Sequence, residues 1–193
     1  MTTKAYFSFI YSSLALLVIL FSSCKKEPEV IIETVTVTDT IVETVIDNSA
    51  TTFILVRHAE IAGGGTNPNL SAAGLARAED LKNVLSNVNL DAVFSTTYNR
   101  TTQTATPTAS DKGLSIQNYD GFDLEPVVDD NIANYPEGAV LVVGHSNTTP
   151  ALLNLLTGSE TYADLPETEF NNLFVVTVYQ KGNATVLEMK YGE

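Results

Sequence analysis

The sequence contains only two histidines, and each one follows a short apolar run. His58 comes just after the segment 52–56, and His145 comes just after the segment 139–143. Continuous apolar runs of this length are typical of buried parallel strands. Because the carboxyl ends of parallel strands meet at one edge of a sheet, where ligands bind, we expect both imidazoles to lie at the same edge.

Two of the three arginines belong to the same edge. Arg57 immediately precedes His58, and Arg100 lies just past the second predicted strand, in the first turn of a helix. Ser146 follows His145 near the start of another predicted helix, whose free backbone N–H groups favour an anion. A guanidinium fork binds two phosphate oxygens at once, which a lysine cannot do. This combination predicts a site for a phosphoryl group.

The pattern of the remaining chain predicts the framework that positions these residues. Strands are expected at 52–56, 91–95, 139–143, 173–179 and 184–191, and helices after Ser71, over 99–109, from near Pro126 and from Thr149-Pro150 to Leu156. Alternating strands and helices predict a three-layer α/β/α fold with a mostly parallel central sheet and helices on both faces. The last two strands predict a hairpin at an antiparallel edge.

Charge and cysteine content exclude several classes of partner and site. Ten basic residues stand against 23 acidic residues, a formal net charge of −13. Such a chain is expected to repel nucleic acid and anionic membrane surfaces. Cys24 is the single cysteine, so an intramolecular disulfide and a zinc site with several cysteines are excluded.

The N-terminus has the pattern of a targeting segment. Lys4 precedes the apolar run 5–21, and Ser22-Ser23-Cys24 follows it. This resembles a bacterial lipoprotein signal, with residues 1–23 removed and Cys24 lipidated as the first mature residue. We therefore expect a lipid-anchored protein of a bacterial cell envelope, periplasmic or surface-exposed. The alternative is an uncleaved anchor helix with an incidental cysteine, although the run is slightly short for a spanning helix.

Residues 24–50 have a composition unlike that of the predicted domain over 51–193. Glu33-Thr34-Val35 recurs as Glu43-Thr44-Val45, and valine, isoleucine and threonine favour extended backbone. One interpretation is a stalk that holds the domain off the membrane. The other is self-association through strand pairing, and the sequence does not decide between them.

Four segments in order resemble the short branch of the histidine phosphatase (phosphoglycerate mutase-like) superfamily. They are Arg57-His58-Ala59-Glu60, Leu70-Ser71-Ala72-Ala73-Gly74, Arg100-Thr101-Thr102-Gln103-Thr104-Ala105 and Val143-Gly144-His145-Ser146. The resemblance covers residues 53 to about 156. Two departures are Ala59, where the family has glycine, and Ser95-Thr96-Thr97-Tyr98, where it has Ser-Ser-Pro.

The resemblance implies a metal-independent phosphatase with no other cofactor. A neutral His58 would attack phosphorus and form a phosphohistidine that water then hydrolyses. Arg57, Arg100 and His145 would stabilise charge on the phosphoryl oxygens, with Ser146 also at the phosphate. The substrate would be a small phosphate monoester or protein phosphohistidine.

Many members of the family place an acid between the second arginine and the second histidine. This interval contains Asp120, Asp123, Glu125, Asp129 and Asp130. We expect Asp123 to protonate the leaving group, with Glu125 as the second choice. The alternatives are that Asp123 caps the following helix or that no dedicated acid exists.

Other classes of function compete with a phosphatase. A membrane-tethered pseudo-enzyme would bind a phosphorylated ligand without turnover, and detection of a phosphohistidine would separate the two. A phosphosugar mutase is disfavoured because the chain between Ser110 and Gly138 is short for a substrate-covering insertion. A purely structural lipoprotein would leave the convergence of histidines and arginines unexplained.

Overall fold

The computed structural model describes residues 32–37, 40–45 and 49–192. The predicted signal segment and the lipidation of Cys24 lie outside these residues. Within the described ranges, no helix is long and apolar enough to cross a membrane.

The valine- and threonine-rich segment forms a β-hairpin. Strand β1 (Ile32–Val37) pairs antiparallel with β2 (Thr40–Val45), and Glu33 lies opposite Thr44. Each copy of the repeated Glu-Thr-Val sequence therefore lies in one strand. The predicted extended backbone is confirmed, while the choice between a stalk and self-association stays open.

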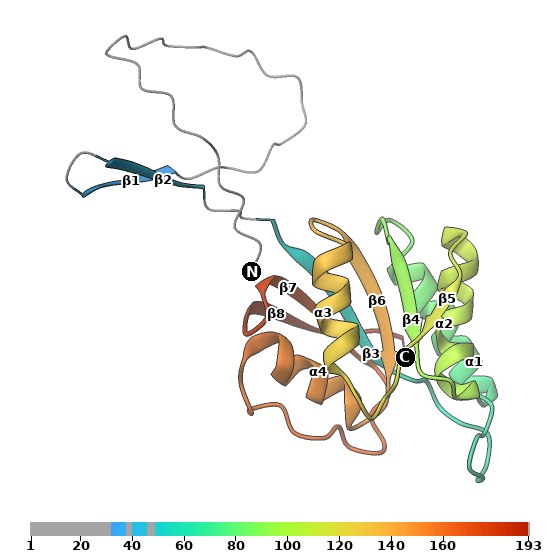
Figure 1. Ribbon diagram of the computed structural model, residues 1–193. Helices are drawn as coiled ribbons and strands as arrows, with labels where there is room; N and C mark the ends of the chain where they lie inside the picture. Colours follow the sequence, from blue (N-terminus) through green and yellow to red (C-terminus); the bar gives the residue numbers. More distant parts are fainter. Residues whose placement is uncertain (1–31, 38–39, 46–48, 193) are drawn as a thin grey trace.

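A six-stranded mixed sheet forms the centre of the domain (Figure 1). Its order is β5 (Ile116–Asn118), β4 (Ala92–Ser95), β6 (Ala139–Gly144), β3 (Thr51–Arg57), β7 (Asn172–Gln180) and β8 (Asn183–Lys190). The first four strands are parallel, and β7 and β8 form the predicted antiparallel edge. The short strand β5 is not predicted from the sequence, because three residues carry no readable periodicity.

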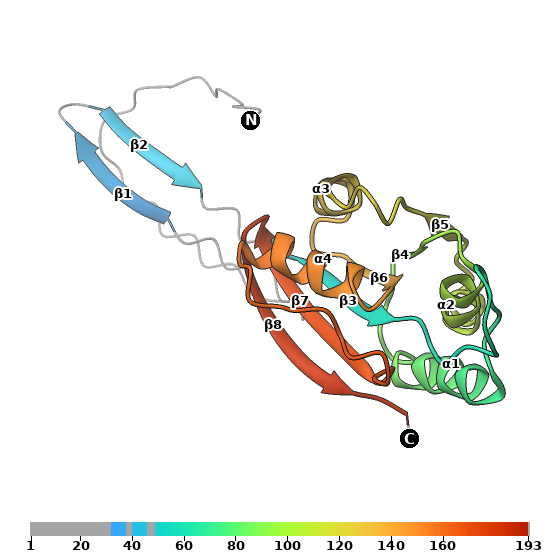
Figure 2. The same cartoon turned by 90° about the horizontal axis from the view of Figure 1, so that it is seen from below.

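Helices cover both faces of this sheet (Figure 2). They are α1 (Ala72–Val84), α2 (Asn99–Lys112), α3 (Glu125–Asn134) and α4 (Thr148–Thr157). Side chains alternate along β3, so Phe53 and Leu55 pack with α3 and α4, whereas Ile54 and Val56 pack with α1 and α2. Both sides of β3 are therefore buried, and the predicted three-layer α/β/α fold is confirmed.

The ends of the helices agree with the sequence in part. The Ser71 side chain accepts a hydrogen bond from the Gly74 N–H and caps α1, as predicted. Helix α4 begins at Thr148 with Asn147 as its N-cap, two residues before the predicted start. Leu124 is the N-cap of α3, and no side chain caps this helix, so the capping role considered for Asp123 is not realised.

The third arginine has a structural role away from the predicted phosphate site. The Arg77 guanidinium forms a two-pronged ion pair with Glu60, with Nη2 at 2.7 Å and Nε at 3.0 Å from the carboxylate. At Gly74, a Cβ would lie 2.1 Å from the Glu60 carbonyl oxygen, so only glycine permits this close approach. Glu60, Gly74 and Arg77 thus fix α1 against the chain that follows β3.

Candidate active site

The ends of two neighbouring strands bring the two histidines together. Strands β3 and β6 are parallel, with Arg57 opposite Gly144, and the His58 N–H donates to the Gly144 carbonyl at 2.9 Å. The two imidazole centroids lie 5.5 Å apart in an edge-to-face arrangement. Both imidazoles therefore lie at the same edge of the sheet, as the sequence predicts.

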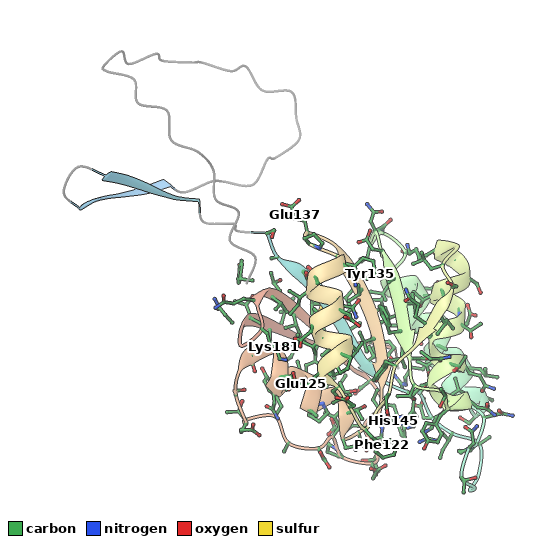
Figure 3. The ribbon with its side chains drawn as sticks, in the orientation of Figure 1. Phe122, Glu125, Tyr135, Glu137, His145 and Lys181 are labelled. Atoms are coloured by element: carbon green, nitrogen blue, oxygen red, sulfur yellow. The ribbon has the colours of Figure 1, made fainter. Side chains whose placement is uncertain are left out.

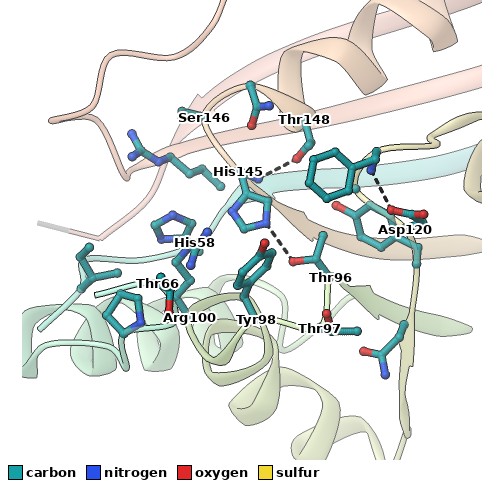
Figure 4. A pocket seen from close by; sticks show the side chains of 18 of the residues that line it. His58, Thr66, Thr96, Thr97, Tyr98, Arg100, Asp120, His145, Ser146 and Thr148 are labelled. Atoms are coloured by element: carbon teal, nitrogen blue, oxygen red, sulfur yellow. Dashed lines mark hydrogen bonds between the residues drawn. The ribbon is translucent and has the colours of Figure 1, made fainter. Parts of the chain in front are cut away.

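A pocket of about 970 Å³ opens over this edge (Figure 4). Its lining includes the predicted Arg57, His58, Arg100, His145 and Ser146, together with Thr96, Tyr98, Tyr119, Asp120, Phe122, Glu167, Phe170 and parts of the glycine-rich loop at Gly65 and Thr66. Three of the four segments that resemble the family therefore contribute side chains to one cavity, and the segment 70–74 does not.

The His58 ring is held as a neutral base. Its Nδ1 lies 2.8 Å from the Ala59 carbonyl oxygen, which can only accept a hydrogen bond, so Nδ1 carries the proton. Nε2 then has a free lone pair. Burial lowers the pKa of His58 to about 4, and the positive charges of Arg57 and Arg100 also lower it. The ring is therefore neutral at neutral pH, with the Nε2 lone pair available.

A chain of hydroxyl groups sets the tautomer of His145. The Thr101 hydroxyl donates to backbone carbonyls of Thr96 and Tyr98, so it accepts a hydrogen bond from the Thr96 hydroxyl at 2.9 Å. Because the Thr96 hydroxyl proton is used in this bond, Thr96 Oγ1 accepts a hydrogen bond from the His145 Nε2–H at 2.9 Å. Burial lowers the pKa of His145 to about 4, and Arg100, His58 and Arg57 lower it further.

Close packing behind His145 requires the glycine that precedes it. A Cβ on Gly144 would lie 2.6 Å from the Thr148 Oγ1 and 3.0 Å from the Tyr119 hydroxyl. The same Thr148 hydroxyl accepts a hydrogen bond from the His145 backbone N–H at 2.8 Å. The first turn of α4 therefore fixes the backbone of His145 (Figure 4).

Arg57 is held by the loop between α4 and β7. Its Nη1 donates to the carbonyls of Pro166 and Glu169 at 2.7 and 3.2 Å, and its Nη2 donates to Glu167 at 2.6 Å. Phe170 stacks on the guanidinium, with its ring centroid 4.4 Å from Cζ. Only 3% of Arg57 is exposed, so its position is rigid.

Arg100 is the more available of the two pocket cations. Its guanidinium stacks on the Tyr98 ring at 4.3 Å, and the Tyr98 ring meets the edge of His145 at a centroid distance of 5.3 Å. Within the part of the chain that the structure describes, Arg100 has no ion pair. Burial lowers the pKa of Arg100, as does the neighbouring Arg57, yet a guanidinium stays charged at any assay pH.

The structure does not place the two favoured acid candidates in the pocket. Asp123 lines a separate cavity of about 300 Å³ beside α3, and Glu125 pairs with Lys181 on the surface (Figure 3). Asp120 lines the pocket instead, and its carboxylate accepts a hydrogen bond from the Phe122 N–H at 2.9 Å. The chain turns here and then runs into α3, which directs Asp123 and Glu125 away from His58.

Thr96, Tyr98, Glu167 and Phe170 are among the lining residues that the sequence pattern did not mark as part of the site. Thr96 and Tyr98 lie in the segment that departs from the family pattern, and this departure is the signal that sequence reasoning left unused. Glu167 and Phe170 lie in a loop without a readable pattern, and the Ser146 hydroxyl donates to Glu167 at 2.9 Å. Within the described chain, no three His, Cys, Asp or Glu side chains are grouped as ligands for a metal ion.

The two lowered histidine pKa values predict how stability depends on pH. Each imidazole has an ordinary pKa of 6.5 and a folded pKa of about 4, so the unfolded chain binds more protons between these values. The contribution of the two neutral histidines to the free energy of unfolding is therefore fully present above pH 6.5 and is lost as the pH falls towards 4. For His58 alone the expected loss is about 3 kcal/mol, from ~1.4 kcal/mol per pKa unit.

Urea unfolding between pH 4.5 and 7.5 measures this dependence. The lowered pKa values of Glu60, Glu167 and Glu169 start from 4.5, so the slope that these carboxylates add lies at the acid end of this window and below it. Because the chain has two histidines, a variant with His58→Asn and His145→Asn should lose the slope in the upper part of the window. A slope that persists there in this double variant would contradict the assignment.

Comparison with known proteins agrees with the site geometry. Residues 53–123 match the family model of the histidine phosphatase superfamily (branch 1). No curated protein matches the sequence. The fold is similar to that of the protein histidine phosphatase SixA complexed with tungstate, with 21% identity and a TM-score of 0.62, covering 72% of this chain and 96% of that chain.

Two further structures share the fold. A candidate phosphohistidine phosphatase SixA from Agrobacterium tumefaciens has 21% identity and a TM-score of 0.58, covering 76% of this chain and 100% of that one. A mycobacterial glucosyl-3-phosphoglycerate phosphatase has 14% identity and a TM-score of 0.60, covering 74% of this chain and 100% of that one. Residues 53–123 are thus similar to the histidine phosphatase superfamily (branch 1), and the domain shares the fold of these phosphatases.

Proposed function

We propose that this protein is a phosphatase that hydrolyses a phosphate monoester or protein phosphohistidine through a phosphohistidine on His58. The match of residues 53–123 to the family model supports phosphatase activity in general. The observation that carries the finer proposal is the unprotonated Nε2 of His58, in one pocket with the guanidiniums of Arg57 and Arg100. Nucleophile and phosphate-binding groups thus share one cavity.

The reaction proceeds in two displacements. The Nε2 lone pair of His58 attacks phosphorus, a P–N bond forms, and the bond to the leaving group breaks as that group takes up a proton. A water molecule then attacks phosphorus, the P–N bond breaks, and inorganic phosphate leaves with Nε2 restored. Arg57 and Arg100 stabilise the charge on the oxygens in both steps, and a bound phosphoryl dianion favours protonation of His145 beside it.

Hydrolysis of p-nitrophenyl phosphate in the presence of EDTA tests this function. We expect turnover to continue in the presence of the chelator. Quenching the reaction with a denaturant during steady-state turnover should trap phosphate on the protein, in a bond that acid hydrolyses and alkali leaves intact. Loss of turnover in EDTA would contradict the metal-independent mechanism. Phosphate trapped on a residue other than His58 would contradict the proposed nucleophile.

A phospho-ligand-binding protein without turnover is the second candidate. One observation favours it: the Glu167 carboxylate already lies against Arg57 and Ser146, where a phosphoryl group would bind. A single-turnover experiment with excess protein separates the two candidates, since a binding protein releases intact ligand and a phosphatase releases inorganic phosphate.

We also propose that acyl chains on Cys24 hold the protein to a bacterial membrane. Cys24 is the single cysteine and directly follows Ser22 and Ser23 at the end of the apolar run. Expression of the full chain in a bacterium with a radiolabelled fatty acid should label the protein and move it to the membrane fraction. Cys24→Ala should abolish the label, and Cys24→Ala protein that is still labelled would contradict the proposal.

A further inference from the structure

The pocket contains equal numbers of acidic and basic side chains. Its cations are Arg57 and Arg100, its carboxylates are Asp120 and Glu167, and no lysine is among the described residues that line it. With both histidines neutral, the formal charges of +2 and −2 cancel. The site therefore lacks any cation beyond those needed for the phosphoryl group itself.

Glu167 is held as an anion at the phosphoryl site. Its Oε2 lies 2.6 Å from Arg57 Nη2, and its Oε1 accepts a hydrogen bond from Ser146 at 2.9 Å. These hydrogen bonds from Ser146 and Arg57 hold the pKa of Glu167 below its ordinary value. The backbone that precedes Glu167 is also fixed, since the Leu165 N–H donates to the Ser146 carbonyl at 2.8 Å and the Pro166 carbonyl accepts from Arg57.

Aromatic rings supply much of the remaining lining. Tyr98 and Phe170 stack on the two guanidiniums, and Phe122 stands at the pocket with 94% of its surface exposed. A large apolar side chain with that exposure offers a stacking surface to a bound group. The faces of aromatic rings also attract cations, and they offer no positive charge that could pair with an anionic group.

We propose that this pocket selects phosphoryl substrates whose leaving group is aromatic or cationic and carries no negative charge. The proposal rests on the proposed phosphatase function and names its substrate class. A bound phosphoryl dianion brings the site to a formal charge of −2 and occupies both arginines. A carboxylate on the leaving group would then meet Asp120 and Glu167 without a partner, whereas an ammonium group would be attracted to both.

Three aryl phosphates of similar shape test the selection. They are 4-methylphenyl phosphate, 4-(aminomethyl)phenyl phosphate and 4-(carboxymethyl)phenyl phosphate, which differ mainly in a charge remote from phosphorus. We expect kcat/KM for the carboxymethyl compound to be about tenfold below that of the methyl compound, and kcat/KM for the aminomethyl compound to be equal or higher. Equal values for all three, or a preference for the carboxylate, would overturn the proposal.

Matched variants identify the carboxylates responsible. Asp120→Asn and Glu167→Gln should each narrow the ratio between the aminomethyl and carboxymethyl substrates, and the double variant should bring it near one. Asp164→Asn removes an acid that is exposed and does not line the pocket, so it should leave the ratio unchanged. A ratio that is the same in the double variant and the wild type would overturn the role of these residues.

A binding measurement keeps this proposal separate from the phosphatase proposal. Titration calorimetry with the three corresponding benzylphosphonates, which are not hydrolysed, reports the charge preference even if no substrate turns over. Discrimination in binding without turnover would refute the phosphatase and leave the selection standing. Turnover that depends on His58 but is indifferent to charge would refute only the selection.

Discussion

We expect His58→Ala to lower kcat for p-nitrophenyl phosphate by about 10⁴-fold or more, because the proposed nucleophile is removed. The other imidazole, that of His145, has its Nε2–H bound to Thr96. Its centroid lies 5.5 Å from that of His58, so it cannot occupy the same position relative to phosphorus. A stopped assay with radiolabelled substrate measures the residual rate.

Two controls make this result specific to the nucleophile. The variant keeps Arg57 and Arg100, so inorganic phosphate should still bind when measured by calorimetry. Thermal unfolding at pH 7.5 should show a folded protein, since an alanine there removes no ion pair. A variant that keeps more than about one-tenth of the activity would refute the mechanism, because loss of a covalent nucleophile costs far more than tenfold.

The framework of the site could be predicted because strong local patterns carry it. The apolar segment 52–56 is hydrophobic on both faces, which identifies a central strand, and the residues that follow such a strand must emerge at the edge of the sheet. Arg57 and His58 are placed by this rule, and His145 by the same rule at β6. These positions depend on local sequence and on a topology that the strand–helix alternation already implies.

The remaining parts of the site depend on tertiary contacts that leave no local pattern. Glu167 and Phe170 reach Arg57 across more than one hundred residues of chain, through a loop held by backbone carbonyls. The structure places Asp120 in the pocket lining, and not the favoured Asp123, for a related reason. A single turn at Asp120, closed by its bond to the Phe122 N–H, decides which carboxylate lines the pocket, and composition does not report such a turn.

Arg100→Ala is expected to lower kcat/KM by about 10²–10³-fold, since it removes a preorganised donor to the phosphoryl oxygens. Arg100 has no ion pair within the described chain, so its charge is free to act on the substrate. It also lowers the pKa of both histidines. Its removal should therefore raise the pKa of His58, and because only the unprotonated ring attacks, the acid limb of the pH profile should move to higher pH.

Arg100→Lys separates these two effects of the arginine. The lysine keeps a positive charge near His58 but cannot bind two oxygens with one planar group. We expect a large part of the rate loss to persist in this variant, while the acid limb stays closer to that of the wild type than in Arg100→Ala. Profiles of kcat/KM from pH 4 to 8 for the three proteins decide the matter. An acid limb that moves to lower pH in Arg100→Ala would refute the electrostatic coupling, because removing a cation cannot favour the unprotonated imidazole.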